Sequence, residues 1–139
     1  MHTALMLSND SRTTAGILLL TVVAVESGGW FMLRILRGGV PATALQQSFF
    51  RAGHAHAGVL VILALVCQIL ADATALSGPV DVVAREGVAV AAILMPAGFF
   101  LSAAGRGVER PNALIVLLYA GVAALAAGVV SLGIGLLTA

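Results

Sequence analysis

The chain has 139 residues, of which 60% are hydrophobic and 9% are charged. A water-soluble domain of this size needs far more polar surface, so the composition excludes an ordinary soluble protein and makes the lipid bilayer the expected surrounding. The formal net charge is +1, and the basic residues do not gather in one patch, so nucleic acid is not an expected partner. The single cysteine, Cys67, rules out an intrachain disulfide.

Four apolar stretches are each near or above the roughly 20 residues that cross a hydrocarbon core. Lipid offers no hydrogen-bond partner to free backbone groups, so these stretches should be helical. They predict an all-α integral membrane protein, a four-transmembrane-helix bundle made of two hairpins. A loose polar N-terminus is expected at residues 1–12 and a single transmembrane domain at 13–139. The four helices are expected at about residues 13–36, 41–76, 82–105 and 111–137.

Glycine and proline mark the expected helix ends. The first helix ends where residues 37–39 bring two glycines, and Pro41 suits the first position of the second helix. The Ser-Gly-Pro segment 77–79 ends the second helix, and Asp81 is the expected N-cap of the third. Pro96 lies in the middle of the third helix and should kink it.

The fourth predicted helix is rich in small residues, with Ala120, Ala124 and Gly128 on one face. This spacing lets helices approach closely, either within one chain or in a homo-oligomer, and a homo-oligomer is expected. A similarity between residues 29–41 and 98–111 also indicates a parallel internal repeat of two hairpins.

Arginine is distributed unevenly along the chain. Five arginines lie in or beside the two loops at 37–42 and 105–111, and two lie on the opposite side. Because arginine that flanks transmembrane helices tends to stay in the cytoplasm, these two loops are expected there. The chain is therefore expected to be a multi-pass protein of the cell membrane with both termini outside.

Ionisable side chains of the first predicted hairpin are the candidate functional residues: Glu26, Arg51, His54 and His56. Such groups are costly inside a membrane and usually face protein or a water-filled cavity. If the first turn is centred near residue 39, Glu26 lies at about the depth of Arg51 and His54. We therefore expect Glu26 to pair with one or both of them. His56 follows His54 by two positions and should point roughly 200° around the helix.

Three interpretations of this cluster remain open. In the first, Glu26 and His54 form a polar pathway for protons, a small solute or an ion, because imidazole titrates near neutral pH. In the second, His54 or His56 acts with Glu26 as a ligand of haem or a transition metal. The two histidine rings diverge, so a full ligand set would need a further chain or an exogenous ligand. In the third, the cluster is structural, in a structural or regulatory membrane subunit.

The segment 51–58, Arg-Ala-Gly-His-Ala-His-Ala-Gly, is similar to the His-x-His segments of haem–copper oxidase-like membrane helices. The similarity is confined to this segment, and the further histidines that such oxidases carry on other helices are missing. No Ser/His/Asp set, Walker loop or CxxC motif is present, so an enzyme is the less favoured class. The expected function is a small membrane transport, channel or proton-coupled protein. A haem- or metal-binding redox protein is the alternative.

Overall fold

The computed structural model describes residues 6–139, which form four long α-helices and one short 3-10 turn. All four α-helices are long and apolar enough to cross a membrane, as the sequence predicted. Residues 1–5 of the expected loose N-terminus lie outside the described residues. The elements are α1 (Asn9–Leu36), α2 (Ala44–Ala71), α3 (Gly78–Ser102), η1 (Ala113–Ile115) and α4 (Val116–Leu137).

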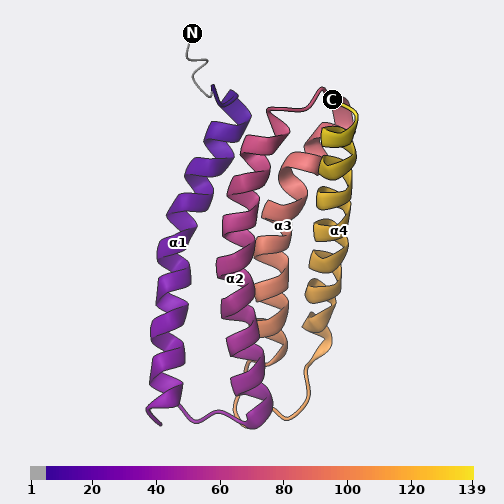
Figure 1. The fold of residues 1–139 in the computed structure, drawn as a ribbon. Coiled ribbons are helices and arrows are strands. Elements are labelled where there is room, and N and C mark those ends of the chain that lie inside the picture. Colours follow the sequence, from indigo (N-terminus) through magenta and orange to yellow (C-terminus); the bar gives the residue numbers. More distant parts are fainter. Residues whose placement is uncertain (1–5) are drawn as a thin grey trace.

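The helices run antiparallel in chain order, with α1 at one edge and α4 at the other (Figure 1). Within the described residues, extensive packing of α1 is confined to α2, whereas α3 packs against both α2 and α4. The main core lies among α2, α3 and α4 and is built from small and branched side chains: Leu60, Val61, Ala64, Ala84, Val88, Ala91 and Leu132. α1 buries few of its own residues and is therefore attached along one side.

α1 begins at Asn9 rather than near residue 13, because Ser8 caps it. The Ser8 hydroxyl accepts a hydrogen bond from the Ser11 amide at 3.2 Å. Capping of this kind satisfies one of the free amides of a first helical turn. Residues 9–12, expected to be loose, are therefore helical.

α2 is shorter than the expected range 41–76, because Thr43 and Gln46 form a capping box. The Thr43 hydroxyl accepts from the Gln46 amide at 3.2 Å, and the Gln46 side chain accepts from the Thr43 amide at 3.1 Å. This reciprocal arrangement starts the helix after Pro41. The helix ends at Ala71, before the predicted breaker segment.

α3 begins with Ser77 at the N-cap position and Pro79 in the first turn, so the expected N-cap role of Asp81 is wrong. Proline fits a first turn because its missing amide would have no helical partner there. Asp81 lies in that turn and forms an ion pair with Arg85. Pro96 is inside α3, as expected, and it is buried.

Small residues bring α3 and α4 into close contact. A Cβ atom on Gly87 would lie 2.7 Å from the Cα atom of Gly128 and 2.8 Å from the Ala124 carbonyl oxygen. A Cβ atom on Gly121 would lie 2.5 Å from Cγ of Met95. Gly121, Ala124 and Gly128 of α4 are therefore covered by α3 of the same chain, whereas Ala120 stays exposed. The close spacing of small residues is used within the chain and no longer supports a homo-oligomer.

Candidate functional site

The four predicted site residues do not form one cluster. His54 faces α1, where a Cβ atom on Gly28 would lie 3.1 Å from its Nδ1 atom. Glu26 is exposed, and within the described residues no hydrogen bond or ion pair joins it to His54 or Arg51. Arg51 is also exposed, and its Nε atom donates to the Gln47 carbonyl of its own helix at 3.2 Å. The expected pairing of Glu26 is therefore not formed.

His56 points away from His54, as the helical spacing predicted. Its ring centroid lies 5.1 Å from that of Phe99 on α3. Its Nδ1 atom donates to the Ala52 carbonyl oxygen at 2.7 Å, which ties the ring to its own helix. In the part of the chain that the structure describes, no group of three His, Cys, Asp or Glu side chains is placed to hold a metal ion.

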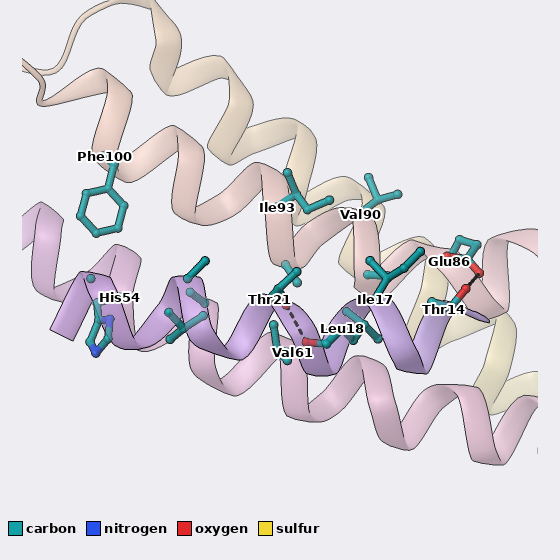
Figure 2. Close-up of a pocket in the computed structure, with 16 residues that line it drawn as sticks. Thr14, Ile17, Leu18, Thr21, His54, Val61, Glu86, Val90, Ile93 and Phe100 are labelled. Atoms are coloured by element: carbon teal, nitrogen blue, oxygen red, sulfur yellow. Dashed lines mark hydrogen bonds between the residues drawn. The ribbon is translucent and has the colours of Figure 1, made fainter. Parts of the chain in front are cut away.

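A groove runs between α1 and α3, with α2 as its floor (Figure 2). It has a volume of about 400 Å³ and exists because α1 packs along α2 and leaves space beside α3. His54 and Phe100 lie at one end, and Glu86 and Thr14 lie at the other. Most of the lining between these ends is apolar: Ile17, Leu18, Val25, Val61, Val90 and Ile93.

Glu86, which the sequence did not single out, provides the carboxylate of this groove. It is partly buried, and its Oε1 atom accepts a hydrogen bond from the Thr14 hydroxyl at 3.0 Å. Within residues 6–139, no basic side chain forms an ion pair with it. The available signal was its position inside the helix predicted at 82–105. Glu86 directly precedes the uncharged stretch of that helix, which starts at residue 87.

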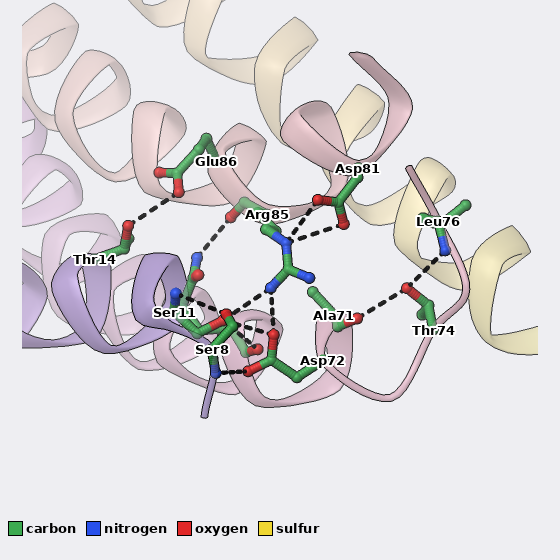
Figure 3. A network of polar contacts seen from close by, with 11 residues as sticks. Ser8, Ser11, Thr14, Ala71, Asp72, Thr74, Leu76, Asp81, Arg85 and Glu86 are labelled. Atoms are coloured by element: carbon green, nitrogen blue, oxygen red, sulfur yellow. Dashed lines mark hydrogen bonds and ion pairs between the residues drawn. The ribbon is translucent and has the colours of Figure 1, made fainter. Parts of the chain in front are cut away.

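A second polar group, which we call the latch, joins the N-terminal end of α1 to α2 and α3 (Figure 3). It consists of Ser8, Ser11, Asp72, Asp81 and Arg85. Nη1 of Arg85 lies 2.5 Å from Oδ1 of Asp72, and Nε of Arg85 lies 2.9 Å from Oδ2 of Asp81. The Ser11 hydroxyl accepts from Arg85 at 2.9 Å. The latch therefore holds α1 where apolar packing is sparse.

Asp72 is the acidic centre of the latch and lies just beyond the end of α2. Burial raises the pKa of its carboxyl group, but hydrogen bonds from the Ser8 amide, Arg85 and Ser11 outweigh burial and lower the pKa to about 2. The Ser8 amide donates to Oδ2 of Asp72 at 2.9 Å. The carboxylate is thus held in its charged form by groups from α3 and from the start of α1.

The fold and the groove define the class: a four-helix protein with candidate membrane spans and a lateral apolar groove. No protein-family model matches the sequence, and no curated protein or solved structure is significantly similar to it. The function must therefore be argued from the groove and its two polar ends.

Proposed function

We propose that this protein is a small multi-pass membrane protein that takes a lipophilic molecule from the bilayer into the groove between α1 and α3, as a transporter or carrier does. The groove is the observation that supports this proposal. Its volume of about 400 Å³ falls in the range of small-molecule sites, which are mostly apolar with a few polar groups that fix orientation. His54 and Glu86 are placed at its ends to fix such an orientation.

The lining favours a lipophilic occupant over a hydrated ion. Between the polar ends, the groove offers the hydroxyl of Thr21, which already donates to the Leu18 carbonyl oxygen at 2.6 Å. A pathway for ions needs polar groups along its length to replace the lost hydration. We therefore replace the expected polar pathway through Glu26 with an apolar groove that has a carboxylate at one end.

The rim of the groove suits entry from lipid. Ile17 on α1 and Ile93 on α3 line the groove and are 59% and 68% exposed. If the four helices span the bilayer, these side chains meet hydrocarbon rather than water. A lipophilic molecule then enters the groove from the hydrocarbon layer, in the plane of the membrane, without crossing a polar surface. Exposed apolar patches of this kind mark surfaces that interact with membranes.

A photoreactive alkyl probe tests this proposal on the full chain in phosphatidylcholine nanodiscs. We expect saturable labelling of groove residues on α1 and α3. Ala57→Phe places a ring on the floor of the groove and should reduce this labelling severalfold. Ala55→Phe is the matched control, because Ala55 is exposed and does not line the groove. Uniform, unsaturable labelling of all four helices would place the probe in bulk lipid and overturn the proposal.

A further inference from the structure

We infer that the molecule bound in the groove is a lipophilic cation, an amphiphile with one hydrocarbon chain and an ammonium head that pairs with the Glu86 carboxylate. This inference rests on the proposed function and specifies the chemistry of its ligand. Four observations support it: the unbalanced charge of Glu86, the acidic character of that end, the shape of the groove and the position of His54.

Glu86 has a hydroxyl partner but, in the part of the chain that the structure describes, no counter-charge. The Thr14 hydroxyl donates to its Oε1 atom at 3.0 Å, and no ion pair to it forms within the described residues. An ionised carboxylate beside hydrocarbon is costly unless a cation or a proton neutralises it. A ligand that brings its own positive charge supplies this neutralisation from inside the groove.

The neighbouring guanidinium is already occupied. The guanidinium group of Arg85 forms ion pairs with Asp72 and Asp81, so two carboxylates already balance its charge. Within residues 6–139, the end of the molecule at which Glu86 lies therefore holds three side-chain carboxylates, of Asp72, Asp81 and Glu86, beside one guanidinium group. Asp10 and Arg12, both exposed on the first turn of α1, offset each other. The remaining negative charge attracts cations and repels anions.

Among the described residues, the other helix beside Glu86 also supplies no counter-charge. α4 lies on the other side of Glu86, where Ala124 and Ala127 line a shallow pocket with it. The sequence of α4, Val116–Leu137, contains no ionisable group other than a tyrosine. Charge complementarity therefore favours a cation at the Glu86 end of the groove, and it does not favour one along the apolar lining.

The groove is long enough for one hydrocarbon chain. Thr14 and Gly28 of α1 both line it and are 14 positions apart, which corresponds to about 21 Å along a helix. His54 lies at the far end, where a positive head would meet an imidazole instead of a carboxylate. A single-chain cation is therefore oriented with its head at Glu86 and its tail towards His54 and Phe100.

The test uses the full chain in phosphatidylcholine nanodiscs and two photoreactive probes. One is dodecyltrimethylammonium with a diazirine at the chain end. The other carries a neutral tert-butyl group in place of the trimethylammonium group, so that it matches the first in shape. Glu86→Gln removes the charge at similar size, and Glu86→Asp keeps it. Glu26→Gln is the matched control, because Glu26 is exposed on α1 and does not line the groove.

We expect the wild type to prefer the cationic probe by about tenfold in groove labelling, which is the scale of one favourable charge contact. Glu86→Gln should lose this preference, whereas Glu86→Asp and Glu26→Gln should retain it.

The outcomes separate the inference from the proposed function. Groove labelling that is equal for both probes and insensitive to Glu86→Gln overturns the cation inference and leaves the lipophilic groove in place. Loss of the preference in Glu86→Asp as well as in Glu86→Gln also overturns it, because charge is then not the cause. Groove labelling by neither probe contradicts the proposed function itself.

Discussion

Arg85 and Glu86 are neighbours in α3, yet their side chains serve different parts of the molecule. Arg85 is bound by Asp72 and Asp81, whereas Glu86 turns to Thr14 on α1 (Figure 3). Successive residues of an α-helix point about 100° apart, so adjacent charges reach different neighbours. One residue closes the latch that holds α1, and the next supplies the carboxylate of the groove beside α1.

Loss of Arg85 should destabilise the protein more than loss of an exposed arginine. Arg85→Gln leaves Asp72 and Asp81 close together without a cation between them. Removing one partner of a buried pair costs up to about 3–5 kcal/mol. Because the paired side chains keep some exposure, 15% for Arg85 and 14% for Asp72, we expect the lower part of this range. Thermal unfolding in detergent measures the difference.

Arg51→Gln is the matched control for that measurement. Arg51 is exposed, and in the described part of the chain its side chain bonds to a carbonyl of its own helix instead of a carboxylate. Its replacement should shift the midpoint of thermal unfolding very little. Equal losses in the two variants would mean that the latch contributes no specific stability.

Asp72 should make the stability of the latch sensitive to strong acid. Its pKa is about 2 in the folded protein, below the ordinary value of 3.8, so the unfolded chain binds the proton more readily. The contribution of Asp72 to stability is therefore fully present above about pH 4 and is lost as the pH falls towards about 2. Asp72→Asn should start less stable and show a flatter decline across this window. A wild-type loss that is complete by about pH 5 would point to another group.

Close packing of α3 on α4 should not tolerate even one added methyl group at Gly87. A Cβ atom there would lie 2.7 Å from the backbone of Gly128, and two helix backbones must separate to admit it. Overpacking of this kind typically costs about 1–3 kcal/mol. Gly58→Ala is the control, because a Cβ atom on Gly58 meets nothing within 4 Å. A thermal midpoint that is unchanged in Gly87→Ala would contradict the close approach.

The helices were predictable because long apolar stretches admit few other structures in lipid, but their ends depend on local capping. The sequence places Thr43 two residues after Pro41, and either could have started α2. The reciprocal hydrogen bonds of Thr43 and Gln46 decide in favour of a later start. Segments rich in cap-forming residues therefore carry more information on helix ends than a lone proline.

The candidate site was predicted in part, because depth along a helix says nothing about direction around it. Glu26 was placed level with His54, yet the residue that meets His54 is Gly28. Two positions along a helix correspond to roughly 200°, so Glu26 points away from that contact. The role of Glu86 was not predictable from the sequence, because Thr14, its hydrogen-bond partner, is 72 residues distant. The groove itself depends on how α1 lies on α2, which no local pattern records.

Orientation is the prediction that decides which side of the membrane the latch faces. The arginine distribution places the α1–α2 and α3–α4 connections in the cytoplasm. These two connections lie at one end of the molecule, and the α2–α3 connection lies at the other (Figure 1). The latch is at the second end, so it should face outwards.

Single cysteines in a Cys67→Ser background test this orientation in intact cells with an impermeant maleimide. Gly39→Cys and Glu109→Cys should stay unlabelled until the cells are opened, and Ser77→Cys should label at once, because all three positions are exposed at their respective ends. Glu109 is preferable to Gly107, whose φ of 64° would strain a cysteine. The reverse pattern would place the latch in the cytoplasm. Equal labelling of all three positions would contradict a single orientation in which the two ends lie on opposite sides of the membrane.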